Sequence, residues 1–123
     1  MTKREKQTDF FRMVALLIVR SHELSTPLCP LEWMRSESTQ ALMVARGASK
    51  TMDSKHLQGL AMDFCFIADL KDDGKLNYPP EKYRVLGEYW ESLGGRWGGR
   101  FGQPNKKRDA PLGWDSGHFE YKD

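Results

Sequence analysis

The sequence predicts an α+β protein forming a single compact domain, with a small, mostly antiparallel sheet and helices packed on it. Three segments place apolar residues at helical spacing, one nearly continuous apolar segment is typical of a buried strand, and no repeat or linker divides the chain. The 123 residues, 39% hydrophobic and 11% aromatic, are enough for one core and leave little room for a second. We therefore expect one domain over residues 1–123.

The first predicted element is an amphipathic helix over residues 10–21, capped by Thr8 and Asp9. Its apolar face would pack on the core through Phe10, Phe11, Val14, Leu17 and Ile18. Two prolines predict a loop over residues 25–30, which leads into a short extended segment over residues 31–34.

Two further helices are predicted from their end signals. One runs from Ser36 to Gly47, because Glu37 suits a first helical turn and glycine is typical of a helix end. The other covers residues 81–92, after a double proline and before the pair Gly94-Gly95. A polar connection over residues 48–54 follows the earlier of these two helices.

The segment Leu60–Ile67 is the strongest strand candidate, and its apolar character predicts a central strand covered on both faces. Alternation places Ala61, Asp63 and Cys65 on one face. A carboxylate in the middle of such a strand costs free energy unless it is paired or bound to a cation. Asp63 therefore needs a partner.

The C-terminal third is less regular. Residues 96–101 form a glycine-rich aromatic strand or loop, and residues 103–113 are polar and irregular. A last extended segment over residues 114–121 brings the second candidate histidine to the fold. The acidic segment 69–77 has the beginning of a calcium loop but lacks its later glutamate, so an exposed turn is favoured.

Charge and cysteine content exclude several classes of protein. With 19 basic and 17 acidic residues, the charge is too balanced to indicate nucleic-acid binding, although the basic segment 106–108 would steer the protein toward an anionic polymer or simply be solvated. Cys29 and Cys65 are expected to be free thiols rather than a disulfide. The N-terminal segment is neither a secretory signal nor long enough to span a bilayer, so we expect synthesis in the cytoplasm and no membrane insertion.

Two motifs far apart in the chain supply metal-binding side chains. His56 and Asp63 lie in the first, and Asp115 precedes His118 by three residues in the second. Two imidazoles and a carboxylate with an open position suit a catalytic zinc ion, and a further carboxylate suits a general base. The alternative is that both histidines are satisfied or surface residues and Asp115 caps a turn. Only three histidines occur in the chain, and two of them fall in these motifs.

The combined motifs resemble those of the zinc-dependent D-Ala-D-Ala carboxypeptidase and L-alanyl-D-glutamate endopeptidase family, and in particular its small phage endolysins. The resemblance covers about residues 32–121. It is carried by the following residues: Ser54, His56, Gly59, Ala61 and Asp63; Asp115, His118, Phe119 and Glu120; Arg35, Ser36 and Gln40; and the segment from Gly94 to Gly99.

The resemblance implies a zinc site at the sheet, holding one ion, and a role for each matching residue. It implies that the zinc ligands are His56, Asp63 and His118. Asp115 would be the general base that activates the zinc-bound water, and Arg35 would hold a substrate carboxylate or stabilise the oxyanion. Weaker matches imply that Ser54 and Gln40 orient substrate or the arginine, and that Trp97 lines the substrate groove or is simple core.

By the same resemblance, the expected activity is that of an L-alanyl-D-glutamate endopeptidase acting on the peptidoglycan stem during phage lysis. The alternatives are a D-Ala-D-Ala carboxypeptidase and a non-catalytic wall-binding protein. Met34 replaces an aromatic residue of many relatives, and aspartate at position 115 favours the endopeptidase branch. We expect a monomer without a wall-binding domain, a Gram-negative host, and a separate holin-type protein that gives access to the wall and periplasm.

Overall fold

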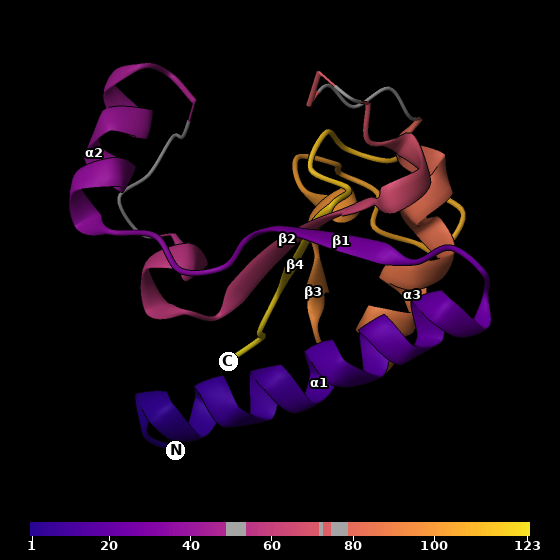
Figure 1. Cartoon of the computed structure of the whole chain (residues 1–123), viewed down its shortest axis with the longest axis horizontal. Helices are drawn as coiled ribbons and strands as arrows, with labels where there is room; N and C mark the ends of the chain where they lie inside the picture. The colour runs from indigo at the N-terminus through magenta and orange to yellow at the C-terminus, as the bar shows by residue number, and fades with distance from the viewer. Residues whose placement is uncertain (49–53, 72, 75–78) are drawn as a thin grey trace.

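A four-stranded antiparallel sheet in the order β1-β2-β4-β3 lies at the centre of the computed structural model (Figure 1). The structure describes residues 1–48, 54–71, 73–74 and 79–123. All strand pairs in these residues are antiparallel, which confirms the predicted α+β class. The strands are β1 (Leu28–Glu32), β2 (Ala61–Phe66), β3 (Arg96–Trp97) and β4 (His118–Glu120).

The first helix, α1 (Lys3–Glu23), begins earlier than the sequence pattern predicted. Thr2 caps it: its hydroxyl accepts a hydrogen bond from the Glu5 amide at 3.1 Å, and the Glu5 carboxylate accepts one from the Thr2 amide at 3.0 Å. This reciprocal pair satisfies two backbone donors at the helix start. The prediction that Thr8 and Asp9 form the cap was wrong, because both lie inside the helix.

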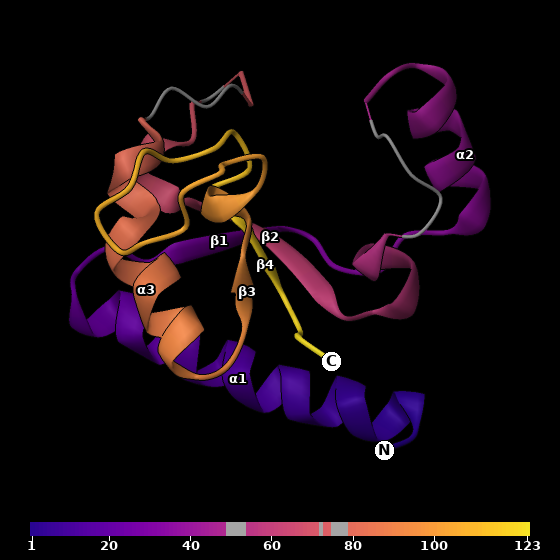
Figure 2. The same cartoon turned by 180° about the vertical axis from the view of Figure 1, so that it is seen from behind.

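Helices α1 and α3 (Arg84–Ser92) pack together over one face of the sheet (Figure 2). Trp90 of α3 joins the layers: its ring lies 5.8 Å from those of Phe10 and Phe119, and its indole donates to the Glu120 carbonyl at 3.0 Å. A 3-10 turn over Pro80–Tyr83 precedes α3, so the start of this predicted helix is not α-helical. The buried core formed here is Phe10, Met13, Val14, Leu17, Leu28, Leu60, Phe64, Phe66, Tyr83, Leu86, Trp90, Trp97, Phe119 and Tyr121.

The central strand β2 has the predicted position and alternation. Phe64 and Phe66 face the helices, whereas Asp63 and Cys65 point to the opposite face. The prediction of a strand covered on both faces was incomplete, because 28% of the Asp63 side chain remains exposed. One face of the sheet therefore holds the core, and the other presents polar groups.

Strand β1 begins at Leu28 within the segment predicted to be a loop, so its predicted range of residues 31–34 was wrong. Pro30 is tolerated because β1 is an edge strand, where a missing amide donor costs little. Cys29 of β1 lies opposite Cys65 of β2, and both are free thiols, as predicted.

Helix α2 (Glu37–Ala45) projects beyond the end of β1, away from α1 and α3 (Figures 1 and 2). It begins where the sequence predicted, with the Ser36 hydroxyl accepting from the Thr39 amide at 3.1 Å. Most of the predicted polar connection after it lies outside the described residues, as does part of segment 69–77. Within the described residues, no helix is both long and apolar enough to cross a membrane.

The C-terminal segment after β4 returns to the beginning of α1 (Figure 1). The Tyr121 hydroxyl donates to the Asp9 carboxylate at 2.8 Å, and Lys6 lies 3.6 Å from the Asp123 carboxylate. Hydrogen bonds from Tyr121 and Arg12 hold the pKa of Asp9 below its ordinary value. The same contact raises the pKa of Tyr121.

We predict that Tyr121→Phe lowers the free energy of unfolding of the metal-free protein at pH 7 by about 0.5–1.5 kcal/mol. Because the Asp9 pKa is depressed in the folded state, this contribution is present above about pH 4 and is lost as the pH falls through the folded pKa. Urea unfolding at pH 7 and at pH 3 measures the loss in free energy of unfolding at each pH. Tyr89→Phe, the same change on α3, is the control. A deficit that is equal at both pH values would contradict the assignment.

Candidate metal centre

Three side chains from three elements converge on the open face of the sheet. His56 comes from the 3-10 helix Lys55–Gln58, Asp63 from β2 and His118 from β4. One ligand atom of each lies within 4.8 Å of the others. Asp63 is opposite His118 in the β2–β4 register, and its Oδ1 lies 3.0 Å from His118 Nδ1 and 3.2 Å from His56 Nε2. The strand carboxylate thus has the partners that the sequence required.

A backbone carbonyl orients the imidazole of His56. Its Nδ1 lies 2.7 Å from the carbonyl oxygen of Trp33, and a carbonyl can only accept, so the proton is on Nδ1. The lone pair is then on Nε2, which is buried and has no hydrogen-bond partner in the described residues. An unpartnered buried nitrogen aimed at a carboxylate fits a metal ligand.

The turn that carries His56 is fixed at both ends. The Ser54 hydroxyl accepts from the His56 amide at 3.2 Å, so this serine caps the turn. Gly59 ends it with φ +68°, and its carbonyl accepts from the Trp33 indole at 2.9 Å. A left-handed glycine allows the chain to reverse directly into β2. The turn and the segment after β1 therefore hold each other in place.

A buried carboxylate orients His118 in the same way. Glu120 Oε1 lies 2.8 Å from His118 Nε2, and Glu120 is only 7% exposed. A carboxylate accepts, so Nε2 carries a proton; Nδ1 faces Asp63 at 3.0 Å and donates to it while the ring is doubly protonated. The sequence analysis gave Glu120 no role. Its separation of two residues from His118 in a strand was the available signal, because such residues share a face.

The electrostatics of the cluster favour a cation. Burial opposes ionisation of Asp63, but the hydrogen bond from His118 and the nearby His56 ring outweigh burial and hold the pKa of Asp63 well below its ordinary value. Burial also opposes charge on His118, yet its bonds to Asp63 and Glu120 raise its pKa to about 9. In the metal-free protein a proton on His118 therefore balances the surrounding carboxylates. A bound cation would replace this proton.

The donor set fits zinc. Two imidazole nitrogens and one carboxylate oxygen, each positioned by another group, leave room for a further ligand as in catalytic zinc sites. The set contains no thiolate, because Cys65 lies two residues further along β2 and is not part of the cluster.

Asp115 lies at the edge of this cluster. Its Oδ2 is 3.8 Å from His118 Nδ1, and 29% of its side chain is exposed. Burial raises its pKa. Its backbone carbonyl accepts from the His118 amide at 3.1 Å, which forms the turn into β4. Asp115 thus combines a position beside the candidate ligands with access from solvent.

Two residues of the glycine-rich segment, Gly98 and Trp97, contact the turn that carries Asp115. A Cβ on Gly98 would lie 2.0 Å from the Asp115 carbonyl oxygen and 2.8 Å from His118 Cβ, so only glycine allows this approach. Trp97 donates from its indole to the Ser116 carbonyl at 2.7 Å. Trp97 is 1% exposed, which leaves almost no surface for a substrate and agrees with its alternative role in the core.

Arg35 lies on the other side of His56, where two side chains hold its guanidinium. Nη2 pairs with Glu32, which the sequence analysis did not identify, and Nη1 donates to the buried Gln40 at 2.7 Å. The Arg35 amide also donates to the His56 carbonyl at 3.0 Å. Arg35 Nε is buried without a hydrogen-bond partner in the described part of the chain. Gln40 therefore contacts the arginine, one of its two predicted roles.

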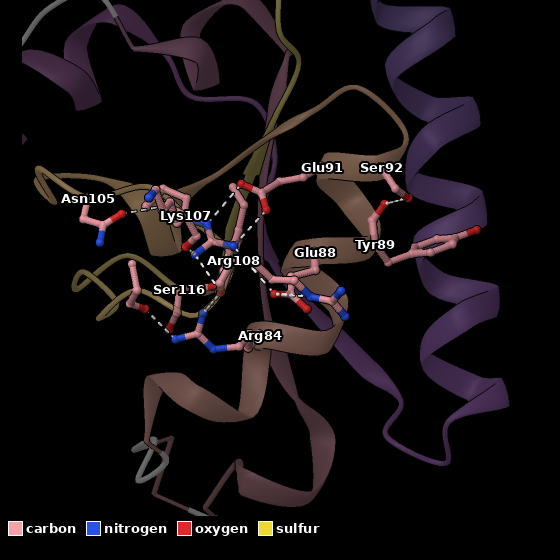
Figure 3. Close-up of polar contacts among 12 residues, drawn as sticks. Arg84, Glu88, Tyr89, Glu91, Ser92, Asn105, Lys107, Arg108 and Ser116 are labelled. Atoms are coloured by element: carbon pink, nitrogen blue, oxygen red, sulfur yellow. Dashed lines mark hydrogen bonds and ion pairs between the residues drawn. The ribbon is translucent and has the colours of Figure 1, made fainter.

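Ion pairs fasten the loop before Asp115 to helix α3. In Figure 3, Glu88 and Glu91 of α3 point toward the loop that carries Lys107 and Arg108. Arg100 is the buried centre of this network and pairs with Glu91 at 3.1 Å. Arg84 donates to carbonyl groups of the loop, including that of residue 110 at 2.7 Å. The network fixes the loop that leads into the site.

Comparisons with known proteins identify the family and support the fold. The family model described as D-alanyl-D-alanine carboxypeptidase matches residues 47–121, which is more than half of the chain. Among solved structures, the chain is similar to the L-Ala D-Glu endopeptidase ChiX of Serratia marcescens, with a TM-score of 0.66 and 24% identity over 94% of this chain and 79% of that chain. A search of curated protein sequences finds no match.

We predict that Glu120→Gln weakens zinc binding by about tenfold and Glu120→Ala by up to about 100-fold, because His118 loses its orienting carboxylate. Competition with a chromogenic chelator measures both dissociation constants. Glu37→Gln, an exposed change in the first turn of α2, is the matched control. Zinc affinities within twofold of wild type for both Glu120 variants would show that Glu120 does not position the ligand.

Proposed function

The chain belongs to the D-alanyl-D-alanine carboxypeptidase family of peptidases, and we propose that it is a zinc peptidase that cleaves the peptide stem of peptidoglycan. The observation that carries the proposal is the placement of Asp115 beside the convergent side chains of His56, Asp63 and His118. A purely structural metal site has no need for a partly exposed carboxylate at its edge.

The proposed chemistry divides between the ion and the protein. A bound zinc ion would supply Lewis acidity, which polarises a carbonyl and lowers the pKa of water to about 7. The two imidazoles and Asp63 would hold the ion. Asp115 Oδ2 would accept the proton of the attacking water and then return it to the leaving amine. Burial strengthens this carboxylate as a base, because it raises the pKa of the group.

Arg35 would provide the fixed positive charge of the site. Its contacts with Glu32 and Gln40 hold the guanidinium in one orientation, so little side-chain entropy is lost when substrate binds. Its unpartnered Nε–H is buried, so it would bind a substrate carboxylate or the developing oxyanion only when the groups that cover it move. Ser54 and Gln40 would act through His56 and Arg35, respectively, rather than by touching the scissile bond.

The proposed scissile bond is L-Ala-D-Glu. Two features support this choice: the fold similarity to the Serratia marcescens endopeptidase, and an aspartate at the proposed base position, where the carboxypeptidase branch commonly carries glutamate. The description of the matching family favours a D-Ala-D-Ala carboxypeptidase as the second candidate. The resemblance to small phage endolysins further supports a role in host lysis, with wall access provided by a separate holin-type protein.

We predict that Asp115→Ala retains zinc and lowers kcat on defined muropeptides by about 10²- to 10⁴-fold, because the base is lost while the ligands remain. His56→Ala is expected to lose both zinc and activity. Asp109→Ala, an exposed change before the site, should match wild type. Zinc content by atomic emission and turnover by chromatography provide the two readouts. Full activity of Asp115→Ala would refute the assignment of the base.

Mass spectrometry of the same reactions identifies the bond that is cut. The proposal expects a product with a new amino-terminal D-Glu and no free D-Ala. Release of D-Ala alone would establish the carboxypeptidase alternative instead. Binding to wall fragments without any hydrolysis, in zinc-loaded protein, would leave only the wall-binding alternative.

A further inference from the structure

A basic pocket lies at the β3 edge of the sheet, outside the candidate metal centre. Its volume is about 320 Å³. Arg96, Phe101, Lys106 and Lys122 line it together with Arg100 and Glu91. Four of these six side chains are basic and one is acidic, which makes the pocket more positive than the chain as a whole.

Neighbouring carboxylates neutralise only part of the positive charge in this pocket. Arg100 forms an ion pair with Glu91 at 3.1 Å, so these two side chains add no net charge to the pocket. Lys106 Nζ donates to the Arg100 carbonyl at 3.0 Å, a neutral group. Within the described residues, no ion pair joins Lys106 or Lys122 to a carboxylate. Arg96 pairs with Glu120 at 3.8 Å, but 56% of its side chain remains exposed, so its guanidinium is still accessible to a ligand.

Arg96, which lines the pocket, lies on the same face of the sheet as the candidate metal centre. Arg96 lies opposite Glu120 in the β3–β4 register, and Glu120 shares its face of β4 with His118. The Phe101 ring stands between the two regions: it lies 5.4 Å from the His118 ring and 5.4 Å from the Arg96 guanidinium. A ligand that reaches His118 is therefore separated from the pocket by one aromatic side chain.

The spacing suits an extended peptide. Two strand separations divide β2, which carries Asp63, from β3, and together they amount to about 10 Å. A peptide advances about 3.3 Å per extended residue, so a group two to three residues from the scissile bond would reach the pocket. Arg35 lies on the opposite, β1 side of the centre. The two basic regions thus flank the proposed reaction site.

We propose that this pocket is a substrate subsite that binds a carboxylate of the peptidoglycan stem two to three residues from the scissile bond. The inference rests on the proposed function for the identity of its ligand. Arg96, Lys106 and Lys122 would supply the positive charge that binds the carboxylate. Phe101 would contact the apolar part of the stem residue. The site sets substrate affinity and takes no part in proton transfer.

The test uses a pair of synthetic stem peptides that differ at one carboxylate on one side of the scissile bond. This carboxylate is free in one peptide and is converted to a carboxamide in the other. A second pair carries the same change on the other side of the bond. Steady-state kinetics are measured for wild type, Arg96→Gln, Lys122→Gln and the control Lys3→Gln, whose exposed charge lies at the start of α1. Calorimetric titration of the same peptides into each protein in an Asp115→Ala background gives dissociation constants that do not depend on turnover.

For one of the two pairs, we expect each pocket variant to raise KM and the dissociation constant of the carboxylate peptide about three- to fivefold. For Lys122→Gln, kcat and zinc affinity should also be unchanged. The same variants should have no effect on the carboxamide peptide. Equal losses for carboxylate and carboxamide in both pairs, or no loss in either, would overturn the subsite. Failure of wild type to cleave any stem peptide would instead remove the proposed function, and the calorimetric comparison would still decide whether the pocket binds the carboxylate.

Discussion

The pairing of β2 with β4 is the constraint on which the candidate site depends. It places Asp63 directly opposite His118 on the face of the sheet that the helices leave open. A slip of one residue would turn Asp63 into the core and expose Phe64, so burial of the aromatic face specifies the register. The same hydrophobic packing that stabilises the fold therefore brings the candidate ligands together.

Around this pair, secondary contacts decide which nitrogen of each imidazole faces the cluster. The Trp33 carbonyl holds Nδ1 of His56, and Glu120 holds Nε2 of His118, so opposite ring atoms of the two histidines point inward. These contacts come from a strand end and from within a strand, where the backbone is fixed. They reduce the reorganisation needed to bind an ion, which supports the proposal of a preorganised metal centre.

The sequence predicted those parts of the site that depend on residue type and local periodicity. A carboxylate in an apolar strand identified Asp63 as a residue that needs a partner, and the two histidine motifs supplied that partner. Glu32 and the Trp33 carbonyl were missed because their contacts depend on the tertiary fold and, for Trp33, on a backbone atom. The predicted start of β1 lies too far along the chain, because prolines are typical of a loop. The edge position of β1 explains why Pro30 is tolerated within the strand.

The most direct test of the central claim is anomalous diffraction at the zinc absorption edge from crystals grown with one equivalent of zinc. The account predicts a single strong peak coordinated by His56 Nε2, Asp63 and His118 Nδ1, at the ligand distances of about 2.0–2.2 Å that zinc takes in proteins. A peak bound through His118 Nε2, a peak elsewhere on the protein, or no peak at these three residues would contradict it.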